Sequence, residues 1–354
     1  MPEPLLEVKN LRVHFPTDDG LVKAVDGLNF SMVAGETLGI VGESGSGKSV
    51  SFLTVMGLIN RKSAIVEGEV IFQGQDLLKL PTDELQAIRG SKIAMIFQDP
   101  MTSLHPFYKV GDQIAEAILA HEDVTKKEAG ARAIEMLRRV NIPRPDERAR
   151  QYPHEFSGGM RHRAMIAMAL SLNPDLLIAD EPTTALDVTV QAQILSLIDH
   201  LQTEFNTAVA LITHDLGVVA GRTDEIAVMY AGQIVEKAPT RTLFAEMRMP
   251  YTEALLQSIP KLDQPSHTRL QAISGRPPDL VDPPVGCRFA PRCLYAQERC
   301  IEEQPPLMES ETPGHFFRCW YPVGTPEGKA ALEKNVKEKH IVDEAEVAAL
   351  EVGV

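Results

Sequence analysis

The residues from position 42 to 49 read G-x-x-x-x-G-K-S, and this short pattern constrains the chain more than any other feature. It follows the apolar run 37–41, which is typical of a buried strand, and precedes a segment, 50–58, that can form a helix. In that setting the glycines let the backbone curl so that successive N–H groups point inward and bind an anion. The helix adds the positive end of its dipole. The alternative is a Gly/Ser-rich turn with an incidental lysine, but the preceding strand favours phosphate binding.

Each residue of this loop is a candidate ligand of a nucleotide. Lys48 can reach the β- and γ-phosphates, and the Ser49 hydroxyl can bind Mg²⁺. The predicted binding residues of the loop are Gly42, Glu43, Ser44, Gly45, Ser46, Gly47, Lys48 and Ser49.

Length and charge limit the classes of protein to consider. The chain has 354 residues, 44% of them apolar, which is enough for two or three domains with real cores. Its net charge of −14 argues against a broad nucleic-acid-binding surface. We find no run of apolar residues long enough to span a bilayer and no secretory signal at the start, so we expect a cytoplasmic protein.

Upstream of the loop, two antiparallel strands are expected at 5–9 and 23–32, joined through 16–20. Phe15 stands where an aromatic ring could stack on adenine, although a lone Phe is more often a core residue. Downstream, we expect a strand at 68–74, a short helix at 83–89 and a strand at 92–97 that ends at Gln98.

The character of the chain then changes. Segments 110–121 and 126–140 have helical apolar spacing, which predicts a helical insertion of about fifty residues that ends near Pro153. Ser157, Gly158 and Gly159 follow, at the start of a helix predicted over 164–172. A Ser-Gly-Gly at that place is either a second anion-binding terminus or an ordinary helix cap, and from this segment alone the cap is favoured.

Two carboxylates follow the next apolar run. Residues 176–179 predict a buried parallel strand, and Asp180 and Glu181 lie at its carboxyl end, where open α/β sheets bind ligands. Asp180 is placed to hold Mg²⁺, and Glu181 to orient or deprotonate a water. A further strand, 208–213, ends at His214, which could hydrogen-bond a γ-phosphate, although a lone His is more often structural. A helix at 190–204 and a closing hairpin at 226–236 complete a predicted α/β fold with a parallel sheet.

This ordered set of motifs resembles the ATP-binding subunits of ABC transporters over about residues 5–240. Gly42–Ser49 matches Walker A, Gln98 the Q-loop, Ser157–Gly159 the signature, 176–180 with Glu181 Walker B, Asp187 the D-loop and His214 the switch histidine. Phe15 matches the A-loop aromatic. The resemblance implies a P-loop NTPase (RecA-like) core with an antiparallel β subdomain and a helical signature subdomain, about 99–160.

Three longer stretches, 97–104, 152–160 and 183–191, resemble the peptide-importer branch, and within it the D-type ATPase subunits of oligopeptide and dipeptide permeases. Met160 is usual in that branch. His162 and His105 replace its usual Gln and Asn, and Met249 replaces a His, but none of these changes removes a catalytic group.

The resemblance implies a mechanism and a set of partners. ATP and Mg²⁺ are bound by Walker A, Gln98 and Asp180, with Ser49, Gln98 and Asp180 as Mg²⁺ ligands and with Glu181, His214 and Gln98 as catalytic residues. Ser157–Gly159 cap the ATP of a second, different ATPase subunit. Two permease subunits and a periplasmic or extracellular peptide-binding protein complete the assembly, with this chain peripheral on the cytoplasmic face of the membrane.

Four cysteines, Cys287, Cys293, Cys300 and Cys319, follow a proline-rich segment at 257–286. Structural disulfides are disfavoured in a cytosolic chain, and zinc usually prefers closer pairs of ligands. Four thiolates in loop-rich surroundings favour a 4Fe–4S cluster, which some peptide-importer ATPases carry. Zinc and free or disulfide-bonded thiols stay as alternatives.

The expected domains are therefore 1–250, 251–323 with the cysteines, and a charged tail at 324–354. Three further functions compete with peptide import. They are import of nickel or glutathione, a soluble ABC ATPase without a transporter, and a P-loop kinase or GTPase. The last lacks a signature motif, and the soluble ABC class would show a heptad insertion or a second cassette.

Overall fold

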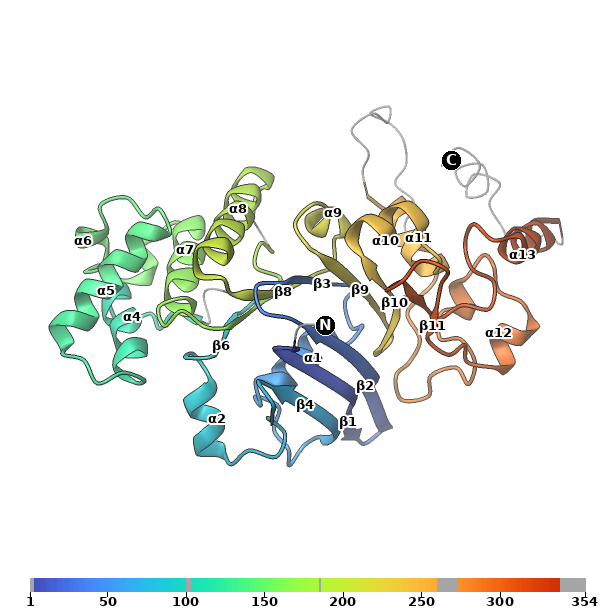
Figure 1. Cartoon of the computed structure of the whole chain (residues 1–354), viewed down its shortest axis with the longest axis horizontal. Helices are drawn as coiled ribbons and strands as arrows, with labels where there is room; N and C mark the ends of the chain where they lie inside the picture. Colours follow the sequence, from blue (N-terminus) through green and yellow to red (C-terminus); the bar gives the residue numbers. More distant parts are fainter. Residues whose placement is uncertain (1–2, 100–102, 185, 260–272, 338–354) are drawn as a thin grey trace.

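The computed structural model describes residues 3–99, 103–184, 186–259 and 273–337. Figure 1 shows three parts along the longest axis of the molecule: a group of helices at one end, two sheets in the middle, and the C-terminal elements at the other end. Three segments discussed above lie partly outside the described residues. They are the stretch 97–104 with its family resemblance, the proline-rich segment 257–286 and the charged tail 324–354.

The first sheet is antiparallel and has the strand order β2-β1-β4-β5. The predicted pair of N-terminal strands is correct, but both strands are longer than expected and reach the turn at positions 18–19. The strands are β1 (Leu6–Thr17), β2 (Gly20–Met32), β4 (Ile65–Phe72) and β5 (Gln75–Asp76).

The second sheet has eight strands in the order β11-β12-β10-β9-β3-β8-β7-β6. Neighbours from β9 to β6 are parallel, as predicted, and β10 returns antiparallel to β9. Two short strands from the C-terminal region extend the edge of this sheet, which the sequence did not predict. The strands are β3 (Thr37–Val41), β6 (Ile93–Ile96), β7 (Leu176–Asp180), β8 (Ala208–Thr213), β9 (Glu225–Tyr230), β10 (Gln233–Pro239), β11 (Met308–Glu309) and β12 (Phe316–Phe317).

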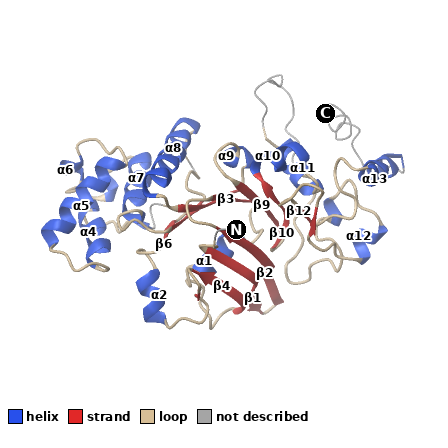
Figure 2. Ribbon diagram, viewed as in Figure 1, coloured by secondary structure: helices blue, strands red, loops and turns tan. Residues whose placement is uncertain are grey.

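Helices gather at one end of the second sheet and along its face (Figure 2). Those between β6 and β8 form the predicted helical insertion and its continuation: α4 (Val110–Leu119), α5 (Lys126–Arg139), α6 (Pro145–Arg148), α7 (Gly158–Ala169) and α8 (Val188–Phe205). The others are α1 (Lys48–Val55), α2 (Thr82–Ile88), α9 (Leu216–Val219), α10 (Thr240–Glu246), α11 (Pro250–Gln257), α12 (Glu298–Glu302) and α13 (Pro326–Lys337). Short 3₁₀ turns cover Pro153–Glu155 and Ala290–Arg292.

The parallel sheet is buried on both faces, which is why its strands are apolar without alternation. Along β7, Leu177 and Ala179 belong to a core shared with the helices, whereas Leu176 and Ile178 belong to a core shared with the antiparallel sheet. Asp180, the last residue of β7, belongs to neither apolar core and lies at the carboxyl end of the strand.

Among the described helices, none combines the length and the apolar character that a membrane crossing needs.

Candidate functional site

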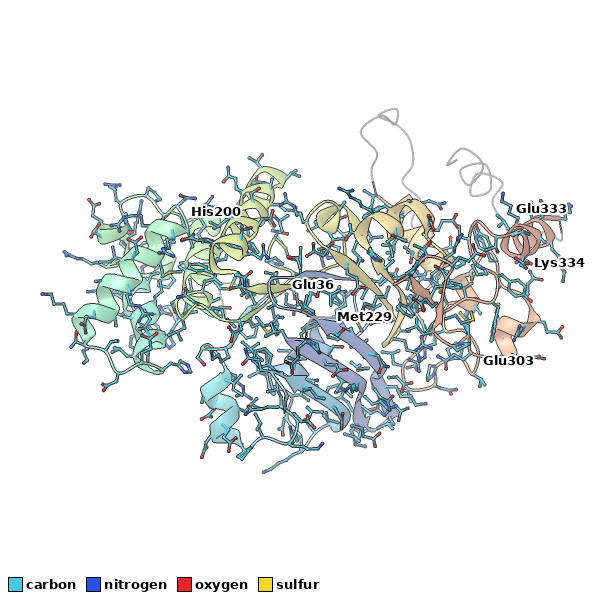
Figure 3. All side chains as sticks on the ribbon, viewed as in Figure 1. Glu36, His200, Met229, Glu303, Glu333 and Lys334 are labelled. Carbon is cyan, nitrogen blue, oxygen red and sulfur yellow. The ribbon has the colours of Figure 1, made fainter. Side chains whose placement is uncertain are left out.

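The phosphate loop joins β3 to α1 and requires glycine at two positions, one because of its backbone conformation and one because of a close contact. Gly47 has φ of 99° and caps α1, which begins at Lys48. A Cβ on Gly42 would lie 2.1 Å from the carbonyl oxygen of Met229, which is labelled on β9 in Figure 3. The loop therefore lies close to the backbone of a neighbouring strand, and the N-terminus of α1 lies at the end of the loop.

Lys48 lies under this loop. It is only 5% exposed, and its Nζ donates to the carbonyl oxygens of Gly42 at 2.7 Å and Glu43 at 3.0 Å. Burial lowers the pKa of Lys48, while Glu181 and Asp180 oppose that shift. The loop carbonyls thus hold the ammonium group next to the place where the loop N–H groups can receive phosphate.

Ser49 in the first turn of α1 meets Asp180 at the carboxyl end of β7. The Ser49 hydroxyl donates to Asp180 Oδ1 at 3.0 Å, so β7 delivers its last carboxylate to the start of α1. Burial raises the pKa of Asp180, against the hydrogen bond from Ser49. A carboxylate that burial disfavours as an anion is one that gains from a bound cation.

Three side chains, from the segments that follow β6, β7 and β8, contact Glu181. Its carboxylate accepts from Gln98 at 2.9 Å and from Thr184 at 2.7 Å, and His214 Nδ1 lies 3.3 Å from Oε1. Burial alone would raise the pKa of Glu181, but the hydrogen bonds to Thr184 and His214 lower it overall. The backbone φ of 47° at Glu181 turns the chain sharply after β7. The three predicted residues Gln98, Glu181 and His214 therefore lie together.

Thr184 was not predicted. It lies three residues after Glu181, within the stretch that carries the family resemblance, but a threonine in such a run has no distinguishing pattern.

Two predicted groups lie apart from this cluster. Phe15 is half-buried on β1, and part of its side chain packs against the core of the antiparallel sheet. Ser157 caps α7, and its hydroxyl accepts from the Met160 N–H at 3.4 Å. Ser157 and Gly158 are exposed, and α7 packs against α4, α5 and α8, away from α1 (Figure 2). Asp187 likewise caps α8.

The phosphate loop also contacts the C-terminal region, which sequence reasoning missed. Arg292 pairs with the Glu43 carboxylate, and the Tyr251 hydroxyl accepts from the Glu43 N–H. These residues are more than two hundred positions from Glu43, and no pattern in the sequence connects them.

The prediction of a 4Fe–4S cluster is wrong for this structure. Cys287, Cys293, Cys300 and Cys319 are free thiols that line one small enclosed cavity. Although the four cysteines share this cavity, no group of three or more His, Cys, Asp or Glu side chains in the described ranges is arranged to hold a metal ion. Burial raises the pKa of all four thiols, which favours their neutral form in this structure.

Comparison with known proteins identifies the family. The family model described as "ABC transporter" matches residues 25–184, and "Oligopeptide/dipeptide transporter, C-terminal region" matches residues 235–300. The chain is 53% identical over 318 residues to the oligopeptide transport ATP-binding protein OppD of Bacillus subtilis, covering 89% of this chain and 88% of that protein. It is 51% identical over 319 residues to the dipeptide transport ATP-binding protein DppD of Lactococcus lactis, covering 90% and 91%.

A solved structure shares the fold. The dimeric, ADP- and Pi-bound ATP-binding cassette MJ0796 superposes with a TM-score of 0.60 at 28% identity, covering 67% of this chain and 99% of that one. This chain belongs to the ABC transporter ATP-binding proteins, and within them to the family of oligopeptide and dipeptide transport ATP-binding proteins. The predicted family, its ATPase activity and the P-loop α/β fold class are confirmed.

Proposed function

We propose that this chain hydrolyses ATP to drive uptake of oligopeptides or dipeptides across the cytoplasmic membrane. One observation carries the chemistry. At the carboxyl edge of the parallel sheet, Ser49 and Asp180 lie beside a Glu181 that Gln98, Thr184 and His214 hold. The family membership carries the substrate class, since its relatives are named for peptide transport.

Lys48 and the loop N–H groups bind the β- and γ-phosphates in this proposal, with Lys48 exchanging its two loop carbonyls for phosphate oxygens. Ser49 and Asp180 offer oxygen donors, the type of ligand that Mg²⁺ prefers, so they fit this ion, and Gln98 is the third proposed ligand. Mg²⁺, when bound, neutralises charge on the transferring phosphoryl group.

Glu181 orients and deprotonates the attacking water. Its lowered pKa keeps it ionised near neutral pH, as a proton acceptor must be. His214 and Gln98 fix the carboxylate and contact the γ-phosphate side of the site. Phe15 stacks on adenine. These roles extend the family resemblance to the residues that match its motifs.

Ser157 and Gly158 are exposed, and Gly159 beside them is half-buried. We propose that they cap ATP bound by a second, different ATPase subunit, which supplies the same residues in return. Two permease subunits dock against this chain, a peptide-binding protein outside the membrane delivers the substrate, and the chain is peripheral on the cytoplasmic face. The proposed domains are 1–250, with a helical subdomain at 99–160, then 251–323 and the tail.

A deletion strain tests the proposal. Uptake of labelled oligopeptide, dipeptide, Ni²⁺ and glutathione is measured without the gene, with the gene restored, and with Glu181→Gln. We expect loss of peptide uptake that the parental gene restores and the variant does not. Intact peptide uptake would contradict the proposal, and selective loss of Ni²⁺ or glutathione uptake would point to the related importers.

A further inference from the structure

The Glu43 side chain is held by an arginine from the other end of the chain. Arg292 Nη1 donates to Glu43 Oε2 at 2.6 Å and Nη2 donates to Oε1 at 3.0 Å. This is the bidentate geometry of the strongest side-chain ion pairs. The Arg292 side chain is 3% exposed and that of Glu43 is 27% exposed, so water screens the pair little.

The backbone of the same loop residue is also held. The Glu43 N–H donates to Tyr251 Oη at 2.8 Å, and the Glu43 carbonyl accepts from Lys48 Nζ at 3.0 Å. Every polar group of Glu43 therefore has a partner. The Ser46 N–H also donates to the Glu43 carbonyl at 3.2 Å, so two of the four partners come from the C-terminal region, which a separate family model matches.

Arg292 is itself fixed on its other side. Its Nε donates to the Ser274 carbonyl at 2.9 Å, and Nη2 also donates to the Ile273 carbonyl at 3.2 Å. The guanidinium lies over the rings of Tyr230 and Phe289, at 5.8 and 5.9 Å from their centroids. Tyr251 packs against the same two rings at 4.6 and 5.3 Å.

The electrostatics favour the same arrangement. Burial would lower the pKa of Arg292, but the hydrogen bonds to Glu43 and Tyr230 raise it overall. The arginine is therefore a permanent cation fixed by its surroundings, rather than a flexible surface side chain that happens to reach Glu43.

We propose that Arg292 and Tyr251 are positioning residues for the nucleotide site, which hold the phosphate loop through Glu43. When nucleotide binds, Lys48 must leave the loop carbonyls for phosphate oxygens, and the loop loses two of its internal hydrogen bonds. Arg292 and Tyr251 keep the loop in its binding geometry during that exchange. The C-terminal region is thus a working part of the nucleotide site, because loop preorganisation determines phosphate affinity.

The structure offers a matched control. Arg288 is another buried arginine of the same region, 7% exposed, and it also ties that region to the core. It donates to the Ala231 carbonyl and to the Asp26 carboxylate, and neither of these residues belongs to the phosphate loop. A role in docking alone should appear equally at both arginines, whereas a role in positioning the loop should appear at Arg292 only.

The test measures binding of a non-hydrolysable ATP analogue with Mg²⁺ to the full chain by calorimetry. Arg292→Lys keeps the positive charge but loses the two parallel hydrogen bonds of the guanidinium to Glu43. We expect the affinity for the analogue to fall about tenfold, with a similar loss for Glu43→Gln. The double variant should be no weaker than the worse single variant, because both act through one pair. Arg288→Lys should bind as the parental chain does.

The ATPase reaction gives the second readout. Arg292→Lys should raise KM while kcat changes little, since the pair acts on binding and not on the attacking water. Tyr251→Phe, which preserves the buried ring, should shift KM in the same direction and serves if Arg292→Lys does not fold. Parental affinity in both Arg292→Lys and Tyr251→Phe, additive loss in the double variant, or equal loss in Arg288→Lys would each overturn the proposal.

Discussion

Burial acts on Glu181 and on Cys319 in the same direction, yet the two groups end in opposite states. Burial raises the pKa of both. At Glu181 the hydroxyl of Thr184 and the ring of His214 reverse that effect, so the carboxylate is ionised. At Cys319 burial outweighs the Tyr321 N–H, which lowers the pKa, and the nearby Cys287, Cys300 and Glu236 raise it further. The surroundings of Glu181 therefore favour its ionised form, whereas the surroundings of Cys319 favour its neutral form.

The difference shows that a set of residue types does not define a site until its neighbours are known. Glu181, just after β7, lies among hydroxyl, amide and imidazole groups that stabilise its anion. Thiols in the C-terminal region lie among one another and among apolar and aromatic residues, including Met249 and Trp320. The first arrangement suits catalysis, and the second suits packing.

The largest expected effect falls on the first region. Glu181→Gln should retain nucleotide binding but lower ATP turnover by ~10²–10⁴, because the amide cannot accept the proton of water. The rate is measured on the full transporter assembly, with binding measured in parallel. Asp199→Asn is the control, since Asp199 pairs with Arg222 and is not among the contacts of the site, and it should leave the rate nearly unchanged. Parental turnover in Glu181→Gln would remove the proposed base.

The first region was predictable because its geometry follows from local backbone rules. A loop of the G-x-x-x-x-G-K-S type fixes where Lys48 and Ser49 lie, and parallel strands deliver Asp180 and His214 to the same edge. Strand and helix positions there agree with the sequence within a few residues. The sequence could not predict the Thr184 contact, because no spacing rule connects a threonine hydroxyl to a particular carboxylate.

The C-terminal region was less predictable because its contacts are distant in the chain. The Arg292–Glu43 pair spans 249 positions. The extension of the sheet by β11 and β12 depends on which edge is open, and the neutral state of the cysteines depends on burial that only the fold defines. Four cysteines after a proline-rich segment indicated a metal site, and composition alone does not distinguish a metal site from a packed cavity.

The next prediction tests the neutral state of the thiols. Burial raises the pKa of the thiols and shields them from solvent, so the native chain should react with a thiol reagent at pH 8 several-fold more slowly than the unfolded chain. In denaturant, four thiols per chain should react. Fewer than four, or iron or zinc released in stoichiometric amount, would show that the cysteines have another partner.

The smallest expected effect concerns a buried carboxylate of the second region. Glu253 accepts from the Tyr295 hydroxyl at 2.9 Å, but burial raises its pKa above the ordinary value near 4.5. A carboxyl with a raised pKa in the folded state binds its proton more tightly there than in the unfolded state. The folded chain therefore loses stability as pH rises from the ordinary value through the raised one, and the penalty is complete above the raised value.

Glu253→Gln removes this penalty and keeps an oxygen for the Tyr295 hydroxyl. The Tm should rise by roughly 1–2 °C at pH 7.5, and the difference should shrink as pH falls toward the ordinary value near 4.5, because the raised pKa keeps Glu253 protonated in the folded chain there. Glu246→Gln is the control, since Glu246 accepts from the Thr312 hydroxyl at 2.9 Å but is exposed, and it should change Tm little at either pH. Differential scanning calorimetry at both pH values measures the effect. A gain independent of pH would mean that lost repulsion or altered packing, rather than the burial of a charge, limits the stability of this region.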